Sequence, residues 1–304
     1  MGYNTDMHRE YENCVLCPRG CGADRTSGRG YCGAGAETTV ARAMPHFWEE
    51  PCISGSRGSG AIFFSGCNLR CSYCQNRDIS FAVRGERMTD RGLADVMLGL
   101  QARGVHNIDL VTATPYLPAV IAALGIAKAR GLHIPVVYNT GGYESEAAVR
   151  ALAQYVDVWL PDLKYASPRL AAEYSRAEDY PETAFAAISL MTELAGAPTY
   201  DADGIMTRGT IVRHLVLPGH RDDSKEVVRR IASLGTDRVV LSLMRQYTPE
   251  FAGEGCDLTR RVTSFEYNAV LGEAMRLGLR GYFQSAESAT SAYTPDFGGT
   301  GTNE

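Results

Sequence analysis

Short apolar segments alternate with amphipathic stretches along the chain from residue 61 onward. Each apolar segment is rich in β-branched or aromatic residues, which is typical of parallel strands that are buried on both faces. The segments cover residues 61–66, 108–112, 134–139, 156–160, 210–217 and 238–244. We interpret these six segments as strands of one parallel sheet.

The stretches between these strands have the pattern of amphipathic helices. Residues 93–100 and 227–234 place apolar side chains on one helix face. Thr263 and Glu266 form a capping-box signature ahead of a further helix. This alternation predicts an α/β fold. Its six units fit a partial (β/α)6 TIM-like barrel better than a closed one, and functional groups in such barrels lie at the C-terminal ends of the strands.

The two ends of the chain differ from this repeating pattern. Residues 1–60 are rich in Gly, Cys and Arg and show little periodicity, which predicts a loop-rich, metal-binding extension ahead of a barrel at residues 61–284. The stretch HFWEEP within it, which holds Glu49 and Glu50, is expected to pack the extension on the barrel, and a contact with the substrate is the alternative. Residues 285–304 are small and polar, so we expect a disordered tail.

Composition narrows the class of protein. Hydrophobic residues make up 45% and charged residues 21%, as in ordinary soluble globular proteins. The net charge of -5 gives no electrostatic reason to expect nucleic acid as a partner. No apolar run approaches the roughly 20 residues that span a bilayer. The N-terminus lacks the basic start and apolar core of a secretion signal, so we expect a cytoplasmic protein without a membrane partner.

Nine cysteines are notable in a protein expected in the cytosol. Disulfides are rare in that reducing compartment, where clustered cysteines indicate metal or redox chemistry. Seven of the nine fall into two clusters. Cys52 and Cys256 stand apart from both and are expected to behave as small buried hydrophobic residues.

The string GCNLRCSYCQN places Cys67, Cys71 and Cys74 directly after the first predicted strand. Three thiolates on one loop leave one iron of a [4Fe–4S] cluster without a protein ligand, and an open coordination position allows a metal to do chemistry. The alternative is a structural zinc site that takes a fourth ligand from elsewhere. Zinc sites use paired cysteines more often than this C-x3-C-x2-C spacing. The position at a strand end favours the chemical role.

This C-x3-C-x2-C string, with aromatic Tyr73 before its last cysteine, resembles the signature of the radical S-adenosylmethionine (SAM) superfamily. The longer matches GSGAIFFSGCNLRCSYCQN, VYNTGGYES, VWLPDLKYASP and RGTIVRHLVLPGH resemble PflX-like relatives of pyruvate formate-lyase activating enzymes. The resemblance implies that SAM binds the open iron. Reductive cleavage would then give a 5′-deoxyadenosyl radical that abstracts hydrogen. A reductant such as flavodoxin or ferredoxin is implied as a partner.

Polar residues follow the second and third predicted strands, where a cofactor with an amine, a carboxylate and a ribose needs partners. Thr112 and Thr114 follow the second strand in VTATP, at the place where many members of the superfamily have a Gly-Gly-Glu motif. Asn139 and Thr140 follow the third strand and are candidates for hydrogen bonds to the ribose or the carboxylate.

Asp162 and Lys164 follow the fourth strand in PDLKY. This element resembles the D-x-K motif of glycyl-radical activating enzymes, where the pair contacts the sulfonium ligand. A carboxylate and an ammonium can hold a charged methionyl group in a desolvated site. The alternative is a surface ion pair, which contributes little.

Further candidates come from the fifth and sixth strands and from the cysteine loop. Strand alternation points Arg213 and His214 to opposite faces, and the bidentate Arg213 is the better partner for a carboxylate. Gln246 follows the sixth strand. Tyr73 and Asn76 lie next to the cysteines, where Tyr73 is a candidate to pack against the adenine.

A second cysteine cluster lies in the N-terminal extension. Cys14, Cys17, Cys21 and Cys32 have the spacing C-x2-C-x3-C-x10-C. Four thiolates match a closed site for zinc or a second iron–sulfur cluster. Metal binding would supply folding energy that this coreless segment lacks, and the lack of an open position favours a structural role. Disulfides are the alternative and fit poorly with a reducing compartment.

The leading hypothesis is a SAM-cleaving enzyme that abstracts hydrogen from a substrate. By resemblance, the substrate is a glycyl-radical protein, and a small-molecule substrate is the alternative within the same chemistry. The competing hypothesis from another class is a non-catalytic scaffold in which both cysteine sites are structural.

Overall fold

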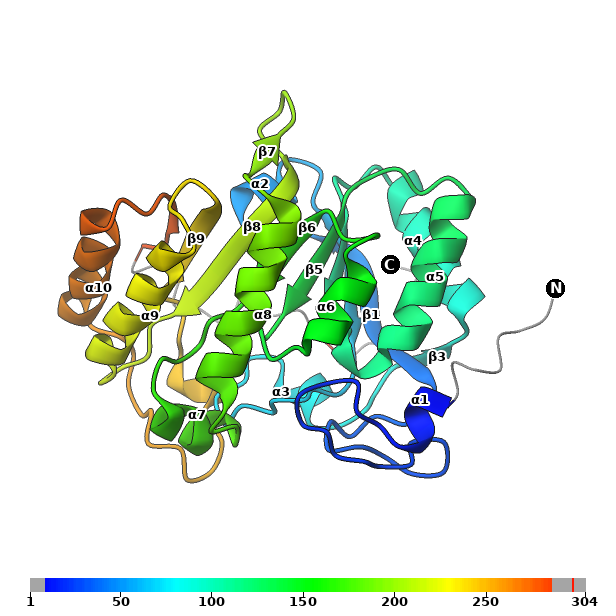
Figure 1. Ribbon diagram of the computed structural model, residues 1–304, viewed down its shortest axis with the longest axis horizontal. Coiled ribbons are helices and arrows are strands. Elements are labelled where there is room, and N and C mark those ends of the chain that lie inside the picture. Colours follow the sequence, from blue (N-terminus) through cyan, green and yellow to red (C-terminus); the bar gives the residue numbers. More distant parts are fainter. Residues whose placement is uncertain (1–8, 286–296, 298–304) are drawn as a thin grey trace.

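The protein is described here from a computed structural model that covers residues 9–285 and 297. Its centre is a curved, mostly parallel sheet with helices packed along its outer face (Figure 1). The parallel strands within the described residues are β2 (Ser59–Phe64), β4 (Ile108–Val111), β5 (Val136–Thr140), β6 (Val158–Pro161), β8 (Met206–Leu215), β9 (Val239–Met244) and β10 (Gly281–Phe283). They lie in the order β10-β9-β8-β6-β5-β4-β2.

The longer helices connect successive parallel strands and cover the sheet from outside (Figure 1). Their bounds are α1 (Arg9–Glu12), α2 (Pro51–Ser54), α3 (Arg77–Ser80), α4 (Asp90–Ala102), α5 (Leu117–Ala129), α6 (Glu146–Leu152), α7 (Pro168–Ser175), α8 (Tyr180–Ala195), α9 (Arg221–Ser233) and α10 (Ser264–Arg276). Short 3-10 turns, η2 (Thr114–Tyr116) and η3 (Pro249–Phe251), follow β4 and β9. The capping box predicted at Thr263 and Glu266 is present at the start of α10. No helix within the described residues is long and apolar enough to cross a membrane.

The six predicted strands are all present, so the prediction of an α/β fold with a partial barrel is confirmed. Strand β10 was not predicted, because its three residues are too few to show a period. It extends the parallel sheet by pairing with β9. The two-residue strand β7 (Thr199–Tyr200) pairs with the start of β8.

The other edge of the sheet is antiparallel. Strand β1 (Thr38–His46) pairs with β2, and β3 (Glu86–Met88) pairs with β1. Residues 38–46 fall in the stretch that the sequence pattern marked as loop-rich. The first four residues of β1 are all buried, so burial does not alternate along this strand. Its sequence therefore lacks the period of a half-exposed strand. The expected tail at residues 285–304 lies outside the described residues, apart from Ser285 and Phe297.

Helix α2 fills the end of the barrel where the strands begin. It lies beside the start of β8 in Figure 1, and its Cys52 and Ile53 pack with apolar side chains from β5, β6, β8 and β9. Cys52 therefore behaves as the expected small buried hydrophobic residue, whereas Cys256 is only half-buried. Because α2 closes this end, the residues just before it, Glu49 and Glu50, reach into the barrel from below.

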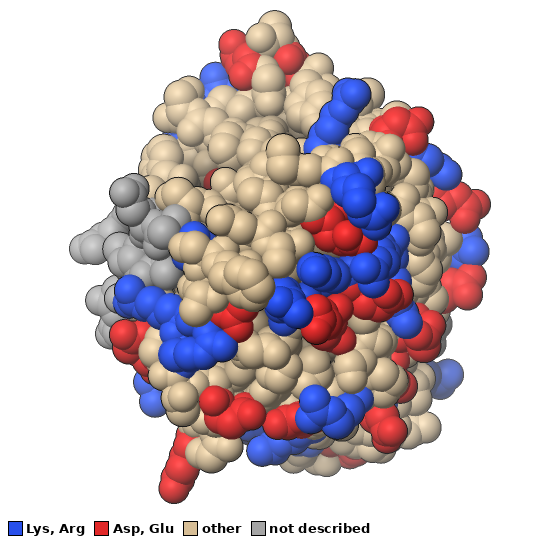
Figure 2. Space-filling model, turned by 90° about the vertical axis from the view of Figure 1, so that its left-hand side faces the viewer, with Lys and Arg blue, Asp and Glu red and all other residues tan. Residues whose placement is uncertain are grey.

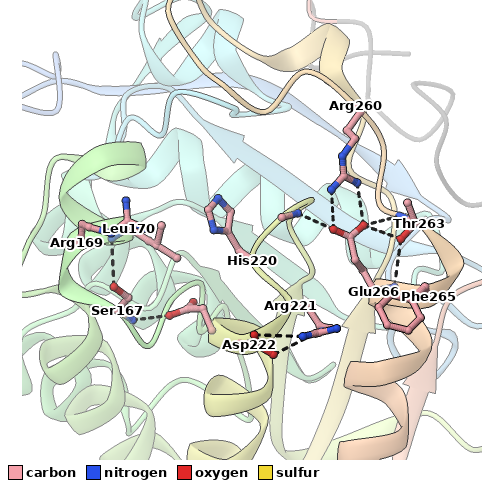
Figure 3. A pocket seen from close by; sticks show the side chains of 12 residues that line it. Ser167, Arg169, Leu170, His220, Arg221, Asp222, Arg260, Thr263, Phe265 and Glu266 are labelled. Carbon is pink, nitrogen blue, oxygen red and sulfur yellow. Dashed lines mark hydrogen bonds and ion pairs between the residues drawn. The ribbon is translucent and has the colours of Figure 1, made fainter.

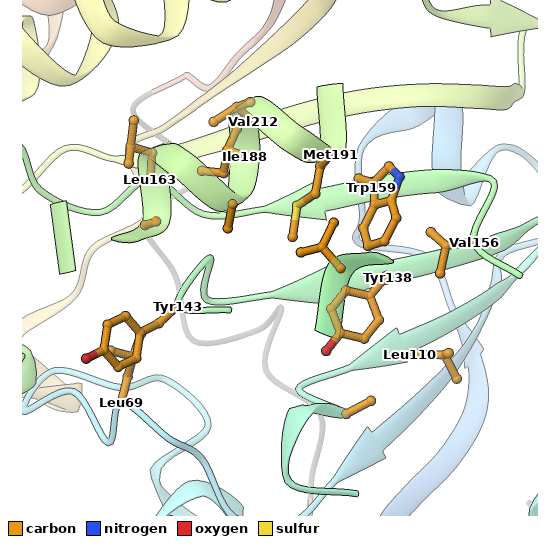
Figure 4. Packing of buried hydrophobic residues seen from close by; sticks show 14 of the residues in the cluster. Leu69, Leu110, Tyr138, Tyr143, Val156, Trp159, Leu163, Ile188, Met191 and Val212 are labelled. Atoms are coloured by element: carbon orange, nitrogen blue, oxygen red, sulfur yellow. The ribbon is translucent and has the colours of Figure 1, made fainter. Parts of the chain in front are cut away.

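The main core lies between the sheet and the helices (Figure 4). Trp159 on β6 is 1% exposed, and its ring lies 5.8 Å from that of Tyr138 on β5, nearly perpendicular to it. Met191 and Ile188 of α8 pack in the same cluster. This packing fixes β5 and β6, the strands whose C-terminal ends carry predicted site residues.

We expect Trp159→Ala to lower the free energy of unfolding by about 3–5 kcal/mol, because it removes the largest fully buried side chain and leaves a cavity. Urea denaturation of the anaerobically prepared protein measures this change. Met275→Ala, at a side chain that is 65% exposed, is the matched control and should stay within about 0.5 kcal/mol of the wild type. An equal effect of both substitutions would contradict the assigned core.

Candidate functional site

Cys67, Cys71 and Cys74 line one pocket at the C-terminal ends of the parallel strands. The pocket has a volume of about 330 Å³, and its walls come from the ends of β4, β5, β6, β8 and β9. Side chains from strands far apart in the sequence therefore converge on the cysteine loop, as expected for a functional site in a barrel.

Each of the three thiols has a neighbouring hydrogen-bonding group. The backbone N–H of Leu69 donates to Cys67 Sγ at 3.4 Å. The Ser175 hydroxyl donates to Cys71 Sγ at 3.0 Å, and the Ser80 hydroxyl lies 3.4 Å from Cys74 Sγ. Groups of this kind around sulfur orient the ligands of a metal cluster and tune its potential.

Lys164 is a cation shared by the three thiols. Burial raises the pKa of each thiol, that of Cys74 to about 12, and the Lys164 ammonium acts in the opposite direction on all three. Burial alone would lower the pKa of Lys164, but Asp162 and the Cys71 thiolate outweigh it and raise this pKa well above its ordinary value. Lys164 Nζ donates to Asp162 Oδ2, and both side chains are largely buried. The pair is therefore not an exposed surface ion pair.

The floor of the pocket is a charged network around Arg213. Its guanidinium binds Glu50 through two hydrogen bonds of 2.8 Å, and it also pairs with Glu49. Arg213 Nη1 donates to Asn139 Oδ1 at 3.2 Å, and the Asn139 amide donates to Asp109. Burial, and then the nearby Glu49, raise the pKa of Asp109 well above its usual range. Two carboxylates thus bind one guanidinium, and a third carboxyl group is linked to it through Asn139.

Most of the predicted site residues meet in this pocket. The predicted residues that line it, besides the three cysteines, are Tyr73, Asn76, Asn139, Thr140, Asp162, Lys164, Arg213 and Gln246. Arg213 faces the barrel interior, whereas His214 points to the other side and hydrogen-bonds the Leu163 carbonyl, as strand alternation predicts. The Tyr73 hydroxyl is bonded to that of Tyr165 at 2.7 Å.

Thr114 lies outside the pocket lining. It begins η2, and its hydroxyl donates to the buried Glu144, which also accepts from Thr140. Thr112 lines the pocket instead, with a left-handed backbone at φ 60°. A β-branched residue in that conformation is strained, and here it sits where the chain turns from β4 into the pocket wall.

Sequence reasoning did not assign Glu49, Glu50, Asp109 or Glu144 to the site. Glu49 and Glu50 precede the first barrel strand, so they lie outside the strand–helix units in which a site is sought. Asp109 lies within an apolar strand, and Glu144 lies in the NTGGYES segment beyond β5. The one available signal was a carboxylate in an otherwise apolar strand segment, since buried charges are rare without a partner.

The N-terminal cysteines lie in the loop between α1 and β1. Cys32 is within electrostatic reach of Cys14, Cys17 and Cys21. The buried guanidinium of Arg25 donates to Cys14 Sγ at 3.5 Å. Among the described residues, no three His, Cys, Asp or Glu side chains converge as the ligands of a single ion do. In an iron–sulfur cluster the thiolates are spread over several irons.

A second hollow, of about 590 Å³, lies between α7, the start of α9 and the segment before α10 (Figure 3). Its charged groups pair with one another: Arg260 binds Glu266, and Arg221 binds Asp222. None of the described cysteines lines it. Figure 2 shows the neighbouring α9–α10 side of the molecule, where acidic and basic side chains are interleaved. The cysteine pocket is thus separate from this hollow.

This chain is similar to one known family and to known proteins. The Radical SAM superfamily profile matches residues 61–231, more than half of the chain. The chain is 28% identical over 277 residues to the uncharacterized protein MJ0674 of Methanocaldococcus jannaschii, which covers 88% of this chain and 76% of that protein. It is 24% identical over 184 residues to the pyruvate formate-lyase-activating enzyme of Streptococcus mutans. This match covers 55% of this chain and 62% of that enzyme.

A solved structure is similar in fold. The crystal structure of Streptococcus suis SuiB bound to precursor peptide SuiA has a TM-score of 0.50 and 13% identity to this chain. The match covers 72% of this chain and 46% of SuiB. At this identity the likeness concerns the fold alone.

His214 makes a testable contribution to the pH dependence of stability. Burial lowers its pKa to about 4, whereas an unfolded histidine titrates near 6.5. The unfolded chain therefore takes up a proton that the folded protein refuses, and the free energy of unfolding falls as the pH drops through this window. In the wild type, His214 should account for about 2 kcal/mol of the fall in the free energy of unfolding between about pH 7 and pH 5. We expect His214→Gln to lack this part of the fall.

Urea denaturation at the two pH values measures this difference. The exposed His133 provides the control, and His133→Gln should keep the pH dependence of the wild type. An unchanged loss of stability in His214→Gln would contradict a neutral, buried histidine.

Proposed function

The chain belongs to the radical SAM superfamily, and from this premise we propose that it cleaves SAM reductively at a [4Fe–4S] cluster held by Cys67, Cys71 and Cys74. Membership in the superfamily makes it an enzyme and implies both the cluster and SAM. When bound, the cluster supplies the single electron that breaks a carbon–sulfur bond of SAM and so generates the radical.

The donor set of the pocket fits such a cluster. The single observation that carries the proposal is that three thiols on one loop, one buried and two partly buried, share the cation Lys164 and each lie beside a hydrogen-bonding group. Negative charge on several sulfurs is costly in a buried site unless a cation compensates it. The fourth coordination position is not taken by a cysteine of the loop, which leaves room for SAM.

The polar groups of the pocket would bind the other parts of SAM. We assign Asp162 and Lys164 to the charged methionyl group, because they are desolvated, paired and adjacent to the thiols. Asn139, Thr140 and Gln246 supply hydrogen bonds to the ribose or carboxylate, and Tyr73 and Asn76 lie beside the loop for the adenine. Thr114 would act only through Glu144, which it shares with Thr140.

Arg213 is also proposed as a partner of the cofactor. Its guanidinium already binds Glu50 with both of its forked bonds, so a methionyl carboxylate would have to compete with Glu49 and Glu50. Its more direct effect is to neutralise the pocket floor, which would otherwise place adjacent carboxylates in a desolvated site.

For the substrate, we propose a glycyl-radical protein, from which the 5′-deoxyadenosyl radical would take a hydrogen atom. Similarity to the Streptococcus mutans activating enzyme supports this class of substrate. The electron would come from a protein reductant of the flavodoxin or ferredoxin class.

Wild-type protein, reconstituted anaerobically with iron and sulfide and reduced with dithionite, should convert SAM to 5′-deoxyadenosine. Cys71→Ala should reduce the product to background, because a cluster ligand is lost, while Cys256→Ala should retain wild-type turnover. Chromatographic quantification of 5′-deoxyadenosine measures the three rates. A wild-type protein that holds the cluster and forms no product would support a structural scaffold instead.

Lys164→Met should weaken SAM binding by at least about tenfold, the equivalent of one charge-assisted hydrogen bond. It should also lower the reduction potential of the cluster, because a cation that stabilises the added electron is removed. Equilibrium dialysis and an EPR-monitored redox titration measure the two effects. Lys128→Met, at a partly exposed lysine of α5, is the control and should change neither.

A further inference from the structure

We propose that Cys14, Cys17, Cys21 and Cys32 hold a redox-active iron–sulfur cluster that passes electrons from the reductant to the cluster in the barrel. This inference rests on the proposed function. It gives the N-terminal extension a role in electron transfer, which does not follow from four-thiolate ligation alone.

The two cysteine loops are joined directly through their backbones. The N–H of Cys67 donates to the carbonyl of Cys32 at 3.1 Å. Gly66 lies so close that an added Cβ would be 2.8 Å from the same carbonyl oxygen. The thiols of Cys32 and Cys67 are also within electrostatic reach of each other. One cysteine of each set therefore meets at a single hydrogen bond.

Side-chain contacts hold the two loops in a fixed relation. Arg19 Nε donates to the Asn68 carbonyl at 2.8 Å, and its Nη2 donates to the Ser175 carbonyl at 2.8 Å. Arg70 Nη1 donates to the Tyr31 carbonyl at 3.2 Å. Ser175 is also the donor to Cys71, so Arg19 connects the extension to a group that touches the barrel thiols. A fixed separation favours electron transfer between two centres.

Exposure changes from one set of cysteines to the other. Cys21 is exposed and Cys17 is partly exposed, whereas Cys32 is 7% exposed and Cys71 is also 7% exposed. The N-terminal thiols therefore extend from the protein surface to the loop that holds the barrel cluster. The pocket is the other approach to the barrel cysteines, and bound SAM and substrate would fill it. The N-terminal thiols therefore offer a reductant a route that bound SAM and substrate would leave free.

The extension also fits an iron–sulfur cluster in its local structure. Three closely spaced cysteines with one distant partner resemble cluster-binding runs more than the paired cysteines of zinc sites. An added Cβ at Gly30 would lie 3.4 Å from Cys32 Sγ and 3.6 Å from Cys21 Sγ, so glycine keeps the space beside these thiols free. Arg25, which is buried and bonded to Cys14 Sγ, offsets the negative charge of the thiolates.

The transfer moves one electron and no atoms. The protein reductant is oxidised by one electron, which the N-terminal cluster accepts and then gives to the oxidised barrel cluster. SAM cleavage consumes that electron. The N-terminal cluster returns to its oxidised state in each turn, so it is a relay and not a reactant.

Metal content tests the first part of the proposal. Anaerobically reconstituted wild type should contain about eight irons per chain, and Cys17→Ala/Cys21→Ala about four. Cys256→Ala is the matched control and should keep the wild-type iron content. Zinc in the N-terminal site, or about four irons in the wild type, would overturn the proposal.

Rapid-freeze EPR tests the relay, because added SAM shifts the signal of the barrel cluster only. Reduction of that cluster by flavodoxin should slow in Cys17→Ala/Cys21→Ala, and the slowing should be at least about tenfold greater than for reduction by dithionite, a small ion that needs no protein docking surface. Cys256→Ala should leave both rates unchanged. An equal effect on both reductants would overturn the relay.

A measurement on the wild type alone is independent of how the variant folds. In the fully reduced protein, two clusters held by adjoining loops should broaden each other's EPR signals. Two signals without magnetic interaction would contradict the proposed arrangement. These results are separable from the proposed function, which fails only if dithionite-reduced wild type forms no 5′-deoxyadenosine.

Discussion

The Lys164 ammonium lies within electrostatic reach of Cys67, Cys71 and Cys74, and it partly offsets the rise in pKa that burial gives each thiol. Lys164 is in turn held by Asp162, directly beyond β6. The barrel provides this arrangement because parallel strands end at the same edge, so the loop after β2 and the element after β6 meet over one pocket. Without the ammonium, a desolvated three-thiolate site would be electrostatically costly.

At the pocket floor, the buried charge of Arg213 is neutralised by two carboxylates. Helix α2 closes the barrel from the end where the strands begin, and Glu49 and Glu50 just before it extend upward to Arg213. The guanidinium is neutralised from below, which leaves the upper part of the pocket to Asp162 and Lys164. Charged groups of the cofactor would thus meet one ion pair beside the thiols and a second network beneath it.

The N-terminal extension depends on the same cysteine loop. Its Cys32 carbonyl accepts the Cys67 N–H, and Arg19 bonds both Asn68 and Ser175. A purely structural metal site would stabilise this segment and nothing more. In the proposed relay, the shared hydrogen bond and the exposure that falls from Cys21 to Cys32 would connect folding of the segment with electron supply to the barrel.

The sequence by itself determined the elements and the position of the cysteine loop, because short apolar runs and helical spacing are local properties of the chain. It predicted that Cys67, Cys71 and Cys74 follow the first barrel strand, and that Arg213 and His214 face opposite ways. Only the tertiary structure decided which groups meet there. Ser175 reaches Cys71 across 104 residues, and Glu50 reaches Arg213 across 163. Such pairs depend on how strands and loops assemble, and local periodicity in the sequence does not predict them.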